Sequence, residues 1–149
     1  MYVQSEKTRI LLVEDSEDDA FFFELALRKT AWLCDLVHVI DGGQAVDYIE
    51  ASWKSATVPD LVFLDLKLPI LTGFEVLEWL TTRNFQPRLR VVVLSGSNHH
   101  ADIVRARELG ALDYLVKPAS PEKLVELLSA FAPRAQEVVA QMARETVAQ

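Results

Sequence analysis

The sequence has little that would indicate an extracellular or membrane-bound protein. Cys34 is its only cysteine, so no internal disulfide can form and a reducing compartment is expected. No apolar run is long enough to span a bilayer, and the polar start of the chain, residues 1–9, lacks the apolar core of a secretory signal. We therefore expect a cytoplasmic protein with no membrane contact.

The sequence also has fewer basic than acidic residues. The chain carries 15 Lys and Arg against 22 Asp and Glu, a formal net charge of -7. Binding to nucleic-acid phosphates needs clustered basic side chains that displace counterions, and the sequence shows no such cluster. DNA is therefore not expected as a partner.

The hydrophobic residues form short runs that predict an alternation of strands and helices. Half of the 149 residues are hydrophobic, the composition of one globular domain. Five runs rich in β-branched residues or leucine are typical of strands: residues 10–13, 36–40, 61–64, 90–94 and 114–116. Between them lie segments with helical spacing, such as Phe22, Leu25 and Ala26. This alternation predicts an α/β fold of the (βα)5 type, with helices on both faces of a parallel sheet.

Turn and capping residues mark the helix boundaries. Gly73 is expected to open the third helix and Gly110 to close the fourth. Ser120 and Pro121 have the residue types of an N-cap and first position for the fifth. We expect a domain over residues 9–132, an N-terminal extension over 1–8 and a C-terminal helical extension over 133–149.

Polar residues follow the predicted strands. Glu14 and Asp15 follow the first, Asp65 the third, Ser95 the fourth and Lys117 the fifth. Ligands of open α/β sheets bind at the carboxyl ends of the strands, so these side chains should converge. Three neighbouring carboxylates repel one another, and oxygen ligands favour a hard cation such as Mg²⁺. A carboxylate nucleophile, a lysine and a hydroxyl are also the groups that phosphoryl transfer needs.

These segments resemble the motifs of response-regulator receiver domains of two-component systems. Residues 12–16 resemble the acidic-pair motif, 64–69 with Gly73 the phosphoacceptor loop, 94–96 the hydroxyl motif and 114–118 the lysine motif. The resemblance covers nearly the whole chain. It implies a flavodoxin-like (CheY-like) sheet in the order 2-1-3-4-5.

The resemblance also implies a reaction and a metal site. Asp65 would take a phosphoryl group from a phosphohistidine on a sensor histidine kinase or histidine phosphotransfer protein. Mg²⁺ would be held by Asp15, Asp65 and the backbone carbonyl of Lys67, with Glu14 assisting through water. Such a domain catalyses only its own phosphorylation and dephosphorylation, so an enzyme acting on other substrates is not expected.

The remaining roles implied by the resemblance concern the response to phosphorylation. Lys117 would pair with Asp65 and then with the phosphoryl group, and the Lys117–Pro118 peptide would often be cis. The Ser95 hydroxyl would move to bond the phosphoryl group while Tyr114 swings inward. The signal would leave by protein contact, as in small regulators that pair with sensor kinases such as bacterial phytochromes.

Three rival functions fit the residues less well. A hydrolase of the haloacid dehalogenase type needs a second acid two residues after its nucleophile, where this chain has Lys67. A nucleotide-binding module needs a glycine-rich loop after the first strand, and residues 14–18 contain no glycine. A receiver that serves only for docking would not need the intact set of site residues.

Several residues have simpler interpretations. Glu17, Asp18 and Asp19 are interpreted as a helix start, where acidic residues favour the helix dipole. His99 and His100 are interpreted as another solvated helix start, and the three tryptophans as packing residues.

Two features keep alternative interpretations. Residues 21–23 are three phenylalanines that cannot all face the core, so they either include a surface docking residue or are covered by neighbouring side chains. In the tail, Val138, Val139 and Met142 form a stripe that either pairs with a second copy or frays.

Overall fold

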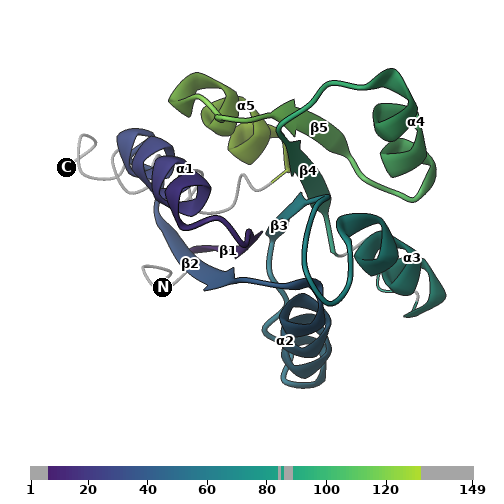
Figure 1. Ribbon diagram of the computed structural model, residues 1–149. Coiled ribbons are helices and arrows are strands. Elements are labelled where there is room, and N and C mark those ends of the chain that lie inside the picture. Colours follow the sequence, from purple (N-terminus) through teal and green to yellow (C-terminus); the bar gives the residue numbers. More distant parts are fainter. Residues whose placement is uncertain (1–6, 84, 86–88, 132–149) are drawn as a thin grey trace.

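Strands and helices alternate throughout the computed structural model, which describes residues 7–83, 85 and 89–131 (Figure 1). The strands are β1 (Thr8–Val13), β2 (Cys34–Val39), β3 (Leu61–Asp65), β4 (Val91–Ser95) and β5 (Asp113–Val116). The helices are α1 (Glu17–Lys29), α2 (Gly42–Lys54), α3 (Gly73–Arg83), α4 (His100–Glu108) and α5 (Pro121–Phe131). The predicted (βα)5 alternation is confirmed.

The five strands form one parallel sheet in the order β2-β1-β3-β4-β5, as predicted. Every residue of β3 and β4 is buried, because these two central strands have helices over both faces. Figure 1 shows α1 and α5 on one face and α2, α3 and α4 on the other. Each face has its own apolar cluster, with Phe23 and Leu124 in one and Ile49, Leu77 and Ala106 in the other.

The predicted helix boundaries agree with the structure. Gly73 is the first residue of α3, and Gly110 follows α4 with a φ of 98°, a left-handed conformation that glycine adopts without a steric penalty. The Ser120 hydroxyl accepts the backbone N–H of Lys123 at the start of α5. His99 and His100 are exposed at the start of α4, as the solvated helix start predicts.

Helix α1 buries a different face from the one that the spacing of Phe22, Leu25 and Ala26 indicated. Its buried residues are Ala20, Phe23, Ala26 and Leu27. Phe21 and Phe22 are 57% and 52% exposed, so only one of the three consecutive phenylalanines enters the core. The helix was predicted correctly, and the exposure of Phe21 and Phe22 favours the interpretation that the three phenylalanines include a surface residue.

The three tryptophans pack within the fold as expected. Trp32 is buried and its indole N–H donates to the Thr8 hydroxyl at 2.9 Å. Trp53 and Trp79 both lie against the ring of Phe85.

No helix among the described residues is long and apolar enough to cross a membrane. The expected extensions, residues 1–8 and 133–149, lie almost wholly outside the described part of the chain. The expectation that Val138, Val139 and Met142 form a pairing surface therefore concerns residues outside it as well.

Candidate functional site

The carboxyl ends of four strands bring the predicted polar residues together. Glu14 directly follows β1, Asp65 and Ser95 end β3 and β4, and Lys117 directly follows β5. Because neighbouring strands are parallel and in register, with Asp65 beside Leu94, their ends meet at one edge of the sheet. The convergence predicted from the strand ends is therefore present.

The ammonium group of Lys117 is at the centre of this edge. Its Nζ donates to Glu14 Oε1 at 2.7 Å, to Asp65 Oδ2 at 3.0 Å and to Asp19 Oδ2 at 3.0 Å. An ammonium group has three donors, so these three carboxylates use all of them. The side chain that the resemblance paired with Asp65 thus also holds two further acids.

Two of the carboxylates around the Lys117 ammonium group are buried, and burial shifts the pKa values of Glu14 and Lys117. Glu14, Asp65 and Ser95 are only 1%, 5% and 4% exposed. Burial raises the pKa of Glu14 to about 7, with a further rise from nearby Asp65, although the hydrogen bond from Lys117 opposes it. Burial would lower the pKa of Lys117, but its hydrogen bonds to Glu14, Asp19 and Asp65 outweigh that effect and raise it. The lysine is therefore charged at neutral pH, while Glu14 is poised between its two forms.

Three carboxylates are suitably placed for a cation. Glu14, Asp15 and Asp65 each offer an oxygen, and these oxygens lie within 4.8 Å of one another. Asp15 is exposed, so the group opens to solvent on one side. An all-oxygen donor set of this kind, open to water, fits Mg²⁺, which keeps several waters and binds through one or two carboxylates.

The loop after β3 orients Asp65. The backbone N–H of Lys67 donates to Asp65 Oδ1 at 3.3 Å, and the N–H of Gly73 donates to the Leu66 carbonyl at 2.8 Å. A Cβ on Gly73 would lie 2.3 Å from the Asp65 carbonyl oxygen, and real Cβ atoms almost never approach another heavy atom within 3.0 Å. Gly73 is thus required for the first turn of α3 to approach the backbone of the acidic residue.

Ser97 forms hydrogen bonds with both Ser95 and Tyr114, the two residues predicted to respond to phosphorylation. Its backbone N–H donates to the Ser95 hydroxyl at 3.3 Å, and its carbonyl accepts the Tyr114 hydroxyl at 3.0 Å. Ser95 and Tyr114 therefore contact the same residue from β4 and β5. The Lys117–Pro118 peptide is cis, as expected.

Two contacts at this edge were missed from the sequence. Asp19 was interpreted only as a helix-start acid, yet it binds Lys117, and His38 Nε2 lies 2.8 Å from the Glu14 carbonyl. Asp19 precedes the buried Phe23 by four residues, and this shared helix face is the signal that could have indicated it. The position of His38 on an edge strand carries no comparable signal.

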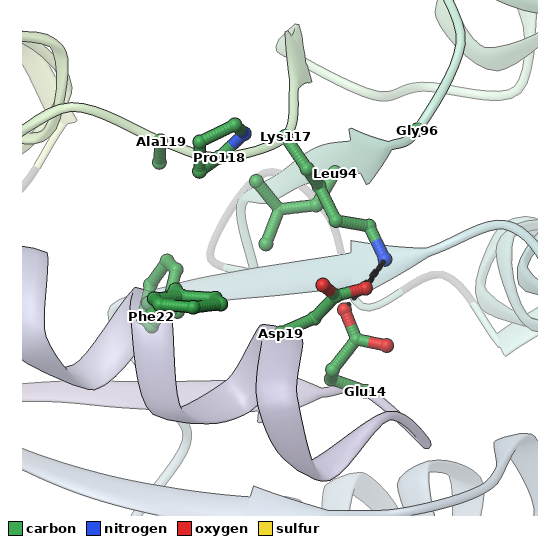
Figure 2. Close-up of a pocket in the computed structure, with 9 residues that line it drawn as sticks. Glu14, Asp19, Phe22, Leu94, Gly96, Lys117, Pro118 and Ala119 are labelled. Carbon is green, nitrogen blue, oxygen red and sulfur yellow. Dashed lines mark hydrogen bonds and ion pairs between the residues drawn. The ribbon is translucent and has the colours of Figure 1, made fainter.

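The site opens into two hollows. One, of about 360 Å³, lies between Lys117 and α1 and is lined by Glu14, Asp19 and the exposed Phe22 (Figure 2). The other lies between the loop after β3 and α4, and its lining includes Asp15, Lys67 and Ser95. The second hollow gives a route to the acidic cluster from solvent.

Comparisons with known proteins agree with this geometry. The family model described as the response regulator receiver domain matches residues 10–129. The chain is similar to the sensory transduction protein BceR of Bacillus subtilis (strain 168), at 31% identity over 123 residues. That match covers 83% of this chain and 49% of BceR, so the chain spans about half the length of this relative.

The chain is also similar to two solved structures of response regulators. The phosphorylated cyanobacterial phytochrome response regulator RcpA is 32% identical with a TM-score of 0.69, over 84% of this chain and 91% of that one. The Mn²⁺-bound form of the response regulator Rcp1 is 30% identical with a TM-score of 0.67, again over 84% and 91%.

Proposed function

The chain belongs to the response regulator receiver domain family, and from this we propose that it accepts a phosphoryl group on Asp65 in a phosphorelay. A receiver is a signalling domain rather than a classical enzyme, and receivers of response regulators partner with histidine kinases. We infer that the donor is a phosphohistidine on a sensor histidine kinase or a histidine phosphotransfer protein.

One observation carries the proposal. Asp65 is a buried carboxylate at a strand end, held by the Lys117 ammonium on one oxygen and by the Lys67 N–H on the other. These two contacts hold the carboxylate beside the oxygens of Glu14 and Asp15. A buried, oriented carboxylate beside a lysine is suited to act as a nucleophile toward phosphorus.

In the proposed reaction, a carboxylate oxygen of Asp65 attacks phosphorus. A P–O bond forms as the P–N bond to the donor histidine breaks, and the histidine nitrogen keeps the electron pair and takes a proton from solvent. Lys117 would compensate negative charge on the phosphoryl oxygens, and the Ser95 hydroxyl would move to donate to one of them. Hydrolysis of the aspartyl phosphate would return the protein to its starting state.

The residues present fit the Mg²⁺ that this reaction requires. Glu14, Asp15, Asp65 and the backbone carbonyl of Lys67 would hold it, and when bound it supplies positive charge that offsets the carboxylates and the phosphoryl oxygens. The similarity to the Mn²⁺-bound form of Rcp1 supports a divalent cation at this cluster.

We further propose how the signal is passed on. Ser95 and Tyr114 both contact Ser97, so a movement of the Ser95 hydroxyl toward a phosphoryl group would disturb the bond that Tyr114 makes. The surface near Tyr114 would then report phosphorylation to a protein partner. The proposal also includes a cytoplasmic location and a homodimer.

A small acyl phosphate with Mg²⁺ tests the central claim. Intact-mass measurement should show one added phosphoryl group on the wild type and on Asp35→Asn, which removes an exposed carboxylate on β2. Asp65→Asn should show none. An unchanged mass in the wild type, or a labelled Asp65→Asn variant, would overturn the assignment of Asp65.

A further inference from the structure

Asp19 occupies a capping position in α1 but does not act as a capping residue. Ser16 is the N-cap, and its hydroxyl accepts the Asp19 backbone N–H at 3.2 Å. In a capping box the acid three residues after the N-cap accepts the N-cap backbone N–H in return. Here the Ser16 N–H donates to Glu14 Oε2 at 3.2 Å, and the Asp19 carboxylate accepts from Lys117.

Helix α3 shows the ordinary arrangement in the same molecule. The Thr72 N–H donates to Glu75 Oε1 at 3.0 Å, and the Glu75 N–H donates to the Thr72 hydroxyl at 3.2 Å. The acid in that box is used entirely by its own helix. The different partner of Asp19 therefore requires an explanation beyond helix capping.

Figure 2 shows Asp19 on α1 and Glu14, which directly follows β1, both reaching the Lys117 Nζ. Together with Asp65 they accept all three hydrogen bonds that the ammonium group can donate. While the Asp65 carboxylate is still intact, an oxygen of the incoming phosphoryl group can bond Lys117 only if one of these three acceptors gives way. The Asp19 side chain is 41% exposed, whereas those of Glu14 and Asp65 are 2% and 7% exposed.

Exposure decides which acceptor is released most easily. A carboxylate that returns to water regains its hydration, so breaking an exposed pair costs little, while a buried carboxylate left without its partner is strongly destabilised. Resting on the proposed phosphorylation of Asp65, we propose that Asp19 is a positioning residue. It holds one hydrogen bond of Lys117 in the unphosphorylated protein and yields it to the phosphoryl group.

Removing this competitor should favour phosphorylation. Asp19→Asn keeps the shape of the side chain but removes a negative charge that attracts Lys117 and repels an anionic phosphoryl donor. An exposed ion pair of this kind affects an equilibrium or rate modestly, so we expect the phosphorylation rate to rise about two- to fivefold. Asp19→Glu retains the charge and should stay close to the wild-type rate.

Asp18→Asn is the matched control. Asp18 is the neighbouring acid in the first turn of α1, and it is exposed, so its substitution makes the same change to the net charge and to the helix dipole. With an acyl phosphate and saturating Mg²⁺, Asp18→Asn should leave the rate unchanged. Nitrogen NMR of the Lys117 ammonium group should show a shift in Asp19→Asn and none in Asp18→Asn.

The outcomes separate this inference from the proposed function. If the wild type takes up no phosphoryl group, the proposed function fails and this inference fails with it. If the wild type is labelled but Asp19→Asn and Asp18→Asn accelerate equally, or Asp19→Asn is slower than wild type, only the role of Asp19 is overturned.

Discussion

The Nζ of Lys117 lies 3.0 Å from Oδ2 of Asp65, although 52 residues separate them in the chain. The same nitrogen compensates Glu14, which is even more deeply buried. Lys117 is therefore both a part of the proposed reaction and a structural counter-charge. The two roles can be measured separately, because stability can be followed without any phosphoryl donor.

Lys117→Met should destabilise the protein by about 3 kcal/mol, because removing one partner of a buried ion pair leaves the other charges uncompensated. Mg²⁺ should recover more stability in this variant than in the wild type, since the cation would take over that compensation. Urea unfolding with and without Mg²⁺ measures both effects. Lys123→Met removes the surface ion pairs of Lys123 with Asp113 and Glu126, where Lys123 is 37% exposed, and should cost less than about 1 kcal/mol. Equal losses in the two variants would contradict a compensating role.

The raised pKa of Glu14 predicts a specific pH dependence of stability. Its pKa is 4.5 in the unfolded reference and about 7 in the folded protein, so between these values the unfolded state releases its proton first. The contribution of Glu14 is therefore fully present below pH 4.5, falls as the pH rises, and is lost above about pH 7. At about 1.4 kcal/mol per pKa unit, the change approaches roughly 3 kcal/mol.

Glu14→Gln isolates this contribution from the other carboxylates. The difference in unfolding free energy between wild type and Glu14→Gln, measured in the absence of divalent cations, should change across pH 4.5–7 and level off above it. A difference that stays constant over this range would show that Glu14 titrates at an ordinary pKa.

Gly73→Ala should damage both stability and phosphorylation. The added Cβ would meet the Asp65 carbonyl oxygen at 2.3 Å and Leu66 Cα at 2.7 Å, so the acceptor loop must shift away from α3. We expect a loss of about 2 kcal/mol or more, within the range of overpacking substitutions. Gly96→Ala is the control, because a Cβ there meets nothing within 4 Å and should change stability by less than about 0.5 kcal/mol. Thermal or urea unfolding of the two variants makes the comparison.

Tyr114→Phe removes the hydroxyl that donates to the Ser97 carbonyl. Loss of a single hydrogen bond of this type costs about 1 kcal/mol. The amide resonances of residues 95–97 should move in this variant, because the same segment contacts Ser95. Tyr48→Phe, on α2, should leave those resonances unchanged. Unmoved resonances in Tyr114→Phe would argue against a link between Tyr114 and Ser95 through Ser97.

The sequence by itself was enough to predict the fold and the polar residues that meet at the strand ends. Buried parallel strands such as β3 and β4 are continuous apolar runs, and each ends at a polar residue whose type is suited to chemistry. Topology then brings these strand ends together whatever the details of packing. The order of strands and polar residues along the chain therefore suffices to place Asp65, Ser95 and Lys117 at one edge of the sheet.

Only the tertiary structure decided how the local faces are oriented and which partners they meet. The choice of Phe23 rather than Phe22 for the core depends on the rotation of α1 about its axis, which three consecutive aromatic residues do not specify. The pairing of Asp19 with Lys117 spans 98 residues and requires α1 and the end of β5 to be in place together. Periodicity in sequence reports the contacts within one element, whereas a hydrogen bond between two elements depends on distances that only packing determines.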